Sequence, residues 1–127
     1  WLDIGTKSSP DKLPKIYYVN WFRKDENGKW LWPGFGENSR VLKWIVERVS
    51  GECKAVETPI GYMPTADAID TEGLDVSEAD MAELLKVNKE DWLREVESIK
   101  EHYANYGEKM PKELFNQLDA LEKRLKE

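Results

Sequence analysis

The front of the chain carries an apolar pattern that is typical of a β-hairpin. Residues 15–22 are dense in β-branched and aromatic side chains, which favours a strand. Both alternating sets of side chains are apolar, so we expect this strand to be buried on both faces. Asn27 and Gly28 form a pair favoured in tight hairpin turns, and residues 29–32 are expected to return antiparallel.

The length of this turn decides which aromatic side chains share a face. In a strict two-residue turn Trp30 pairs with Asp25, and Phe22 and Trp30 then point to opposite faces. A longer or bulged loop places both rings on one face.

A helix is expected after the hairpin. Residues 33–36 (Pro-Gly-Phe-Gly) break the strand, and Asn38 or Ser39 is expected to cap the helix. The helix is expected to run to about Val49, with Gly51 ending it. Helical spacing predicts that its core-facing positions are Leu42, Ile45 and Val49, with Val41 alongside.

The back of the chain predicts a short extended segment, at residues 60–63, and then three helices. Ser77 and Asp80 resemble a capping box at the start of the first of these helices. Asn88 is expected to cap the second helix, and Pro111 is expected to start the third. The short link between the last two helices predicts an antiparallel helical hairpin. The predicted inward positions are Met81, Leu84 and Leu85, then Trp92, Val96, Ile99 and Tyr103, then Leu114, Leu118, Leu121 and Leu125.

These elements predict an α/β fold class, which becomes α+β if the chain is taken as an isolated piece. The 127 residues suffice for one domain with a modest core and are too few for two. We divide the domain into a lead-in (1–14), a strand–hairpin–helix unit (15–50), a loop with a short strand (51–76) and a helical tail (77–127).

The ends of the chain and its cysteine content suggest a context. The sequence begins at Trp1, without a signal-peptide pattern, and no apolar run is long enough to span a membrane, so we expect no membrane partner. We interpret Trp1 as a cut inside a longer protein. The single cysteine, Cys53, excludes an internal disulfide and favours a reducing, cytoplasmic location.

Charge is distributed unevenly along the chain. The whole chain has a net charge of −6. Residues 1–49 hold 9 Lys and Arg against 6 Asp and Glu, and the remaining residues hold 10 Lys and Arg against 19 Asp and Glu. Nucleic-acid binding needs one continuous positive face, so this distribution argues against it. The acidic half is typical of solvated helix surfaces.

The chain offers no group of residues that predicts catalysis. His102 is the only histidine, and no second histidine or cysteine lies at metal-ligand spacing. Cys53 has no base that spacing would pair with it, and the acids lie along helices opposite Lys and Arg. We therefore predict neither catalytic residues nor metal ligands in this chain.

Aromatic residues are the more informative signal. Eight of the 14 fall between Tyr17 and Trp44. Core packing explains several of them, but it explains poorly Phe35, which lies between Gly34 and Gly36 on a loop. Such a backbone is able to present a ring or to admit a flat group against it. Glu37 disfavours a phosphate at this place, so a neutral flat ligand fits better.

Two longer segments resemble the GTP-dependent phosphoenolpyruvate carboxykinases. These are residues 20–25 (Asn-Trp-Phe-Arg-Lys-Asp) and residues 31–42 (Leu-Trp-Pro-Gly-Phe-Gly-Glu-Asn-Ser-Arg-Val-Leu), with Gly28 between them. Residues 58–61 (Thr-Pro-Ile-Gly), residues 73–75 and the acidic terminal helices also resemble the C-terminal end of that family.

The resemblance implies a function. The family is a lyase that converts oxaloacetate and GTP to phosphoenolpyruvate, carbon dioxide and GDP with Mn²⁺ or Mg²⁺, in gluconeogenesis. It implies that Phe22, Trp30 and Phe35 surround the guanine base and that Asn38 reads its edge. The family usually has phenylalanine at the position of Trp30, so the pocket width differs here. The full set of expected guanine-site residues is Trp21, Phe22, Trp30, Phe35, Gly36, Glu37 and Asn38.

The resemblance also implies what this chain lacks. The phosphate loop, the metal ligands, the substrate-binding arginines and the mobile lid of the family all precede the segments that match here. We therefore expect the chain alone to be inactive and its partners to be GTP and the remainder of the parent enzyme. Exposed apolar surface would also favour self-association of the isolated chain.

Guanine selection should depend on the base edge, because stacking holds any purine with about 1–3 kcal/mol per base. Asn38 carries a donor and an acceptor, and either could face the base. Backbone N–H groups of residues 36–39, at a helix start, are donors only. We expect this helix start, with Asn38 as an adjustable partner, to prefer O6 of guanine to the amino group of adenine.

Two alternatives from other classes remain open on the sequence. One is a stand-alone aromatic-lined module that binds a sugar or a peptide. The other is a purely structural piece whose aromatic residues form a core.

Overall fold

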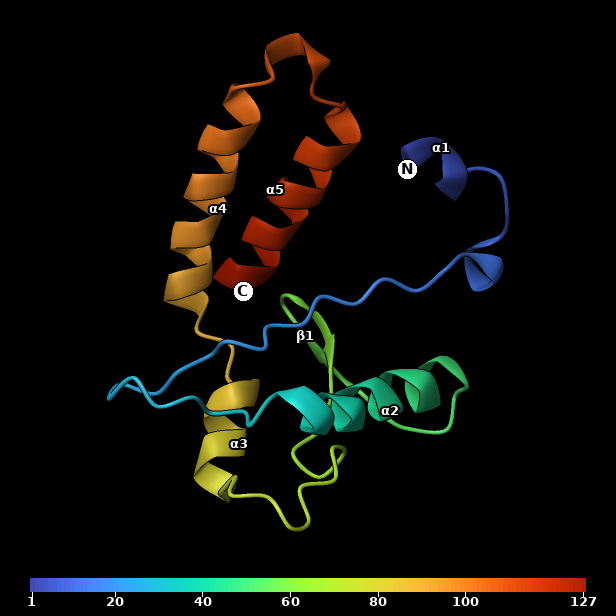
Figure 1. The fold of residues 1–127 in the computed structure, drawn as a ribbon. Coiled ribbons are helices and arrows are strands. Elements are labelled where there is room, and N and C mark those ends of the chain that lie inside the picture. The colour runs from blue at the N-terminus through green and yellow to red at the C-terminus, as the bar shows by residue number, and fades with distance from the viewer.

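The computed structural model describes all residues, 1–127, as five α-helices, three short 3₁₀ helices and one small sheet (Figure 1). The chain begins with α1 (Leu2–Gly5), η1 (Pro10–Lys12), η2 (Phe35–Glu37) and α2 (Asn38–Val49). It continues with β1 (Val56–Thr58), β2 (Gly61–Met63), α3 (Glu78–Leu85), α4 (Lys89–Ala104), η3 (Gly107–Lys109) and α5 (Lys112–Lys126).

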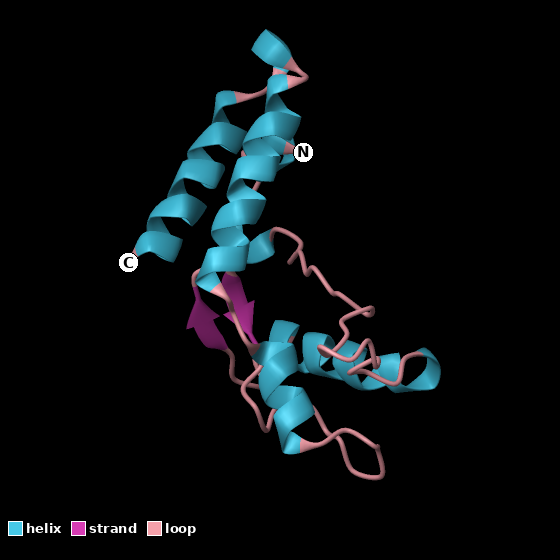
Figure 2. Ribbon diagram, turned by 90° about the vertical axis from the view of Figure 1, so that its left-hand side faces the viewer, coloured by secondary structure: helices cyan, strands magenta, loops and turns pink.

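The four longer helices lie in two groups with the sheet between them. The α4–α5 hairpin stands on one side and α2 and α3 on the other, in both views of the ribbon (Figures 1 and 2). The two strands pair antiparallel, with Val56 opposite Met63 and Thr58 opposite Gly61. This arrangement confirms the predicted α+β class and the predicted helical hairpin.

Each group of helices has its own small core. The core at α2 and α3 contains Trp32, Trp44, Ile69 and Met81, and the core of the α4–α5 hairpin contains Val96, Leu118 and Leu125. Arg124 links α5 to the sheet, because its Nε donates to the carbonyl oxygen of Pro59 at 2.8 Å in the β1–β2 turn. Since only eight residues are buried in the whole chain, both cores are thin.

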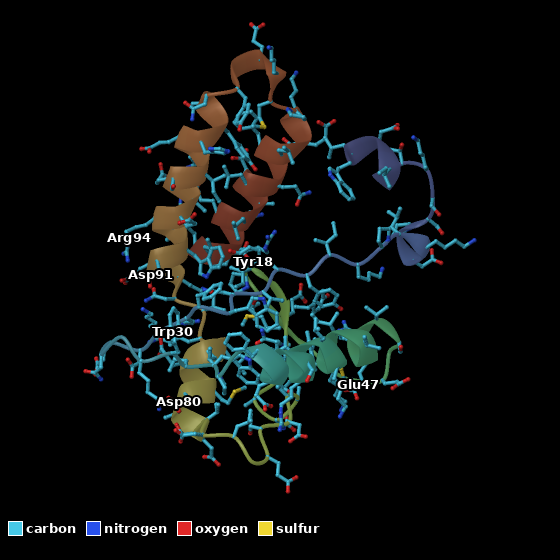
Figure 3. All side chains as sticks on the ribbon, viewed as in Figure 1. Tyr18, Trp30, Glu47, Asp80, Asp91 and Arg94 are labelled. Carbon is cyan, nitrogen blue, oxygen red and sulfur yellow. The ribbon has the colours of Figure 1, made fainter.

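The predicted strand at residues 15–22 is wrong. The segment is extended as far as residue 20 but pairs with no other strand, and Ile16 and Tyr18 are 84% and 92% exposed (Tyr18 is labelled in Figure 3). Only the other set of side chains is partly buried: Tyr17, for instance, packs edge-on against Trp44 with ring centroids 6.1 Å apart. Strand propensity reflects packing against neighbouring strands, and this segment has none.

The helix α2 has the predicted end but a different cap and a different buried face. Glu37 precedes the first turn, and the Ser39 hydroxyl donates to the Gly36 carbonyl oxygen instead of capping. Trp44 is buried, whereas Leu42 and Val49 are 52% and 57% exposed, so the prediction that they face the core is wrong. The helix turns its large indole inward because that side chain buries the most apolar surface.

The caps of the later helices confirm the prediction. The Ser77 hydroxyl accepts from the N–H of Asp80, whose carboxylate accepts in return from the N–H of Ser77, and Asn88 accepts from two N–H groups of α4. Inward positions such as Met81, Val96 and Leu118 are buried as expected.

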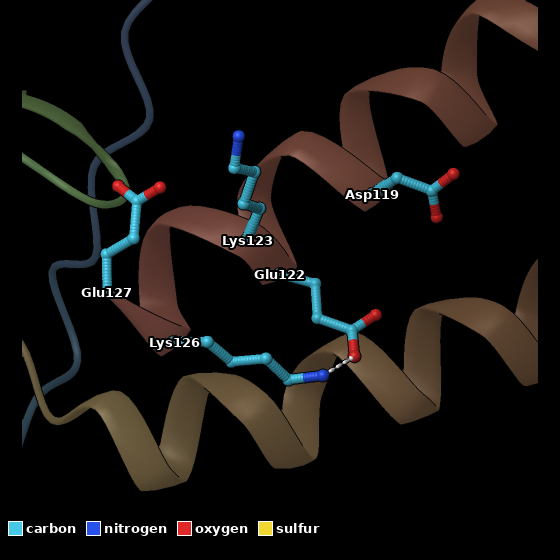
Figure 4. Close-up of a pocket in the computed structure, with 5 residues that line it drawn as sticks. All are labelled: Asp119, Glu122, Lys123, Lys126 and Glu127. Atoms are coloured by element: carbon cyan, nitrogen blue, oxygen red, sulfur yellow. Dashed lines mark hydrogen bonds and ion pairs between the residues drawn. The ribbon is translucent and has the colours of Figure 1, made fainter.

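One ion pair joins α4 to α5, and a second one within α5 shares the same carboxylate. The Glu122 carboxylate accepts from Lys100 on α4 at 2.7 Å and from Lys126 one turn later at 2.5 Å (the latter pair appears in Figure 4). These two hydrogen bonds, Lys100 first, lower the pKa of Glu122 to about 2. The same contact raises the pKa of Lys100.

Acid should weaken this hairpin through Glu122. A carboxyl whose folded pKa is depressed stabilises the fold above its unfolded value of about 4.3, and that contribution is lost as the pH falls through about 2. We expect the melting temperature to fall less steeply between pH 5 and pH 2 in Glu122→Gln than in the unaltered chain. Glu95→Gln, at an exposed α4 residue without an ion pair, is the control and should keep the original slope. Identical slopes in all three would contradict the role of Glu122.

Candidate functional site

Three aromatic side chains of the front segment lie at the surface. Phe22 is 73% exposed, Trp30 50% and Phe35 97%. The interpretation of these rings as core is therefore wrong, although it holds for Trp32 and Trp44, which are 6% and 4% exposed. Several exposed aromatic rings in one short segment are typical of a binding surface.

The loop of the front hairpin, residues 24–30, brings Phe22 and Trp30 together. Lys24 pairs with Trp30, so the loop between them is longer than a two-residue turn. Asp25 closes it, because its carboxylate accepts from the N–H of Lys29 at 2.8 Å. The rings of Phe22 and Trp30 consequently meet edge to face, with centroids 5.8 Å apart.

Lys24 adds charge to this pair of rings. Its Nζ lies 4.0 Å from the centroid of the Trp30 ring, within the range of a cation–π contact. Arg23, the residue before Lys24, reaches the end of α3, where its guanidinium donates to the Leu84 carbonyl oxygen and to Glu83, both at 3.1 Å. Arg23 thus fixes the hairpin to α3.

The backbone at Phe35 is bent to present its ring. Phe35 has φ +46°, the only positive φ of a residue other than glycine, and Gly34 before it has φ +79° and ψ −167°. Glycine reaches this region at low cost, whereas Phe35 is strained there. The ring makes no pair with another aromatic ring of the chain, so it is available to a flat ligand.

Asn38 makes one side-chain hydrogen bond, with Trp32. The indole Nε1–H of Trp32 donates to Oδ1 of Asn38 at 3.0 Å. The amide is therefore held in one orientation, and the prediction of an adjustable Asn38 is wrong. Its side chain is also not a helix cap, because Asn38 lies in the first turn of α2 and accepts from no backbone N–H there.

Two of the backbone N–H groups expected to face a ligand are already used. The N–H of Glu37 donates to the Gly34 carbonyl oxygen at 3.1 Å, and that of Asn38 donates to the Phe35 carbonyl oxygen. The cause is η2, whose tight turn precedes α2 and satisfies these donors locally. The expectation that both are unpaired is wrong, which leaves the Asn38 amide as the clearer source of donors.

Glu37 is engaged with Arg40. The Arg40 Nε donates to the Glu37 carboxylate at 2.6 Å, and its two terminal nitrogens donate to the carbonyl oxygens of Asp70 and Glu72, each at 3.0 Å. Arg40 thereby ties the turn at Phe35 to a distant loop and balances the charge of Glu37. Sequence reasoning missed this role; the spacing of Glu37 and Arg40, three residues apart at a helix start, was the available signal.

The other expected site residues lie nearby. Trp21 packs against the core cluster of Trp32 and Trp44, so it is not among the exposed rings. Gly36 lies in η2, and no atom comes within 4 Å of the position that a Cβ would occupy there.

The other polar candidates are Cys53, His102 and the charged residues of α5. No three His, Cys, Asp or Glu side chains come together in a way that could hold a metal ion. The Cys53 thiol points to the Trp44 carbonyl oxygen at 3.6 Å, and His102 lies beside Tyr106. A surface hollow on α5 is lined by charged side chains alone (Figure 4): Asp119, Glu122, Lys123, Lys126 and Glu127. None of the helices has the length and apolar content that crossing a bilayer demands.

Comparison with known proteins identifies the family. The model of the phosphoenolpyruvate carboxykinase C-terminal P-loop domain matches residues 1–124. A protein of Neocallimastix frontalis named phosphoenolpyruvate carboxykinase (GTP) is 58% identical over 127 residues, 99% of this chain and 21% of the relative. Proteins of the same name from Paenarthrobacter aurescens and Treponema pallidum are each 48% identical over 98% of this chain, which covers 21% and 20% of them. The chain spans about a fifth of the length of these relatives, and it belongs to the family of the phosphoenolpyruvate carboxykinase C-terminal P-loop domain.

Proposed function

We propose that this chain is a C-terminal part of a GTP-dependent phosphoenolpyruvate carboxykinase and contributes the site for the guanine base. The parent enzyme would convert oxaloacetate and GTP to phosphoenolpyruvate, carbon dioxide and GDP. The observation that carries the proposal is the set of exposed rings, Phe22, Trp30 and Phe35, in the same segment as Asn38. The names of the relatives support the identity of the nucleotide.

Each part of the site has a physical task. The rings of Phe22, Trp30 and Phe35 would bind the flat faces of the base by stacking and edge contacts. Asn38 would bind its edge. Trp21 would support the hairpin from the core, and Gly36 and Glu37 would shape the turn that carries Phe35.

The chemistry itself is assigned to the remainder of the parent protein. Neutralisation of phosphate charge by Mn²⁺ or Mg²⁺ is part of the proposal, but the residues present here do not fit such an ion. We therefore derive no step of the reaction from this chain. We place the enzyme in the cytoplasm because Cys53 is a free thiol and needs no oxidising compartment.

Removing the Phe35 ring tests the stacking role. In the full-length parent enzyme, Phe35→Ala is expected to raise KM for GTP and for ATP by similar factors, roughly 5- to 150-fold, which corresponds to about 1–3 kcal/mol of stacking. The measurement is steady-state kinetics with each nucleotide.

Tyr18→Ala is the matched control for Phe35→Ala, since Tyr18 is a 92% exposed ring in the same front half and lies outside the proposed site. It should leave both KM values unchanged. An unaltered KM for GTP in Phe35→Ala would remove the ring from the site and, with it, the main support for base binding here.

A further inference from the structure

The hydrogen bond between Trp32 and Asn38 suggests how guanine is chosen. We propose that Trp32 is a positioning residue: its indole N–H holds the Asn38 amide in one orientation, so that the amide offers only N–H donors to the base. The role rests on the proposed function and adds a physical origin for its preference between purines.

The chemistry of the two side chains fixes the direction of this bond. An indole nitrogen only donates, whereas an amide has an accepting oxygen and a donating NH₂ group. The atom of Asn38 that lies 3.0 Å from the Trp32 nitrogen is therefore its oxygen. Turning the amide over would set donor against donor in a partly buried contact and leave both unsatisfied.

Trp32 is well placed to act as an anchor. It is 6% exposed and packs in a cluster with Trp44, Ile69 and Met81, so its ring has little freedom to follow Asn38. Asn38 begins α2, and Arg40, two residues later, is bound to the loop at Asp70 and Glu72. Both ends of the hydrogen bond are thus attached to ordered parts of the fold.

The fixed amide discriminates between bases by the polarity of their edges. Guanine carries the acceptor O6 at the position where adenine carries a donating amino group. The NH₂ group of Asn38 satisfies O6, whereas adenine would meet it donor to donor. Hypoxanthine, which also carries O6, should be accepted like guanine. Trp32 touches no nucleotide in this scheme and acts only through Asn38.

Trp32→Phe in the full-length parent enzyme tests the proposal, because it removes the indole donor and keeps an aromatic ring. We expect the ratio of kcat/KM for GTP to kcat/KM for ATP to fall roughly 5- to 150-fold, since the freed amide is able to turn. The value for ITP should follow that for GTP. A merely structural role would lower all three values together and leave the ratios unchanged.

Trp44→Phe is the matched control. Trp44 lies in the same cluster and is 4% exposed, but its Nε1 has no hydrogen-bond partner. This variant loses the same volume without releasing Asn38, so its GTP-to-ATP ratio should equal that of the unaltered enzyme. An unchanged ratio in Trp32→Phe, or an equal fall in Trp44→Phe, would overturn the proposal.

A spectroscopic measurement covers the case in which Trp32→Phe fails to fold. In the unaltered 127-residue chain, the Trp32 indole N–H should exchange slowly with solvent, and Asn38→Ala should shift its resonance and speed its exchange. A resonance that does not respond to Asn38→Ala overturns the proposal. The proposed function and the proposal about Trp32 can fail separately. If Phe35→Ala raises the KM for GTP while Trp32→Phe leaves the GTP-to-ATP ratio unchanged, only the role of Trp32 is rejected.

Discussion

Asn38→Asp in the full-length parent enzyme is expected to invert the preference for the base. One carboxylate oxygen takes over the hydrogen bond from Trp32, and the other stands where the NH₂ group of Asn38 stood. That oxygen would face O6 of guanine acceptor to acceptor, with a negative charge, while the amino group of adenine could donate to it. Because unsatisfied contacts to charged groups exceed the usual 1–3 kcal/mol, we expect kcat/KM for GTP to fall by about 100-fold or more. The value for ATP should fall far less or rise.

Asn20→Asp is the control for the added charge. Asn20 lies in the same segment, and its Oδ1 accepts from the N–H of Phe22 at 2.9 Å, a contact that a carboxylate preserves. It should leave the ratio of GTP to ATP use unchanged. If Asn38→Asp still preferred GTP, the amide of Asn38 would not be the group that reads the base.

The later helices were predictable because their signals are local. A capping box at Ser77 and a cap at Asn88 satisfy N–H groups within three residues, whatever the rest of the fold does. The stripe containing Val96 and the stripe containing Leu118 face each other because a short link leaves the two helices little choice. The cap of α4 and the core of this hairpin follow from such short-range rules.

The front half was less predictable because its structure depends on distant contacts. Residues 15–20 carry strand-forming side chains but find no strand to pair with. Arg23 and Arg40 hold the hairpin and the helix start through carbonyl oxygens that lie 30 to 63 positions away in the sequence. No periodicity reveals an arginine that binds a remote backbone.

The candidate site shows the same difference between local signals and distant contacts, here for single side chains. The glycines around Phe35 predicted a presented ring, and the positive φ of that residue agrees with them. Asn38 instead resembled a cap, and only the position of the Trp32 indole shows that its oxygen is already occupied. The residue types of a site are visible in the sequence, whereas the polarity that they present depends on tertiary neighbours.

The apolar residues left outside on α2 need a different explanation. Leu42, Val46 and Val49 are 52%, 64% and 57% exposed and lie along one face at helical spacing. An apolar stripe of this kind on a helix is typical of a contact surface. The relatives are about five times as long as this chain, so we propose that the remainder of the parent protein covers the stripe. A second copy of the chain covering it, as self-association would require, is the alternative outcome.

Two leucine truncations separate the core of this chain from that stripe. In the 127-residue chain, Leu118→Ala, at a residue 5% exposed in the α4–α5 core, is expected to lower the free energy of unfolding by about 2–5 kcal/mol. Leu42→Ala removes the same atoms from a half-exposed position and should change that free energy by no more than about 0.5 kcal/mol. Chemical denaturation followed by circular dichroism measures both.

Repeating the pair of truncations in the full-length parent protein tests what covers α2. If the remainder of that protein packs on the stripe, Leu42 becomes a core residue, and Leu42→Ala should then cost nearly as much as Leu118→Ala. A cost that stays small in the full-length protein would show that the stripe remains in solvent there. A cost in the isolated chain that grows with protein concentration would instead identify a second copy as the partner, because association stabilises the folded state by mass action. The cost of Leu42→Ala in the two proteins therefore shows whether the stripe on α2 is covered by the remainder of the parent protein, covered by a second copy or exposed to solvent.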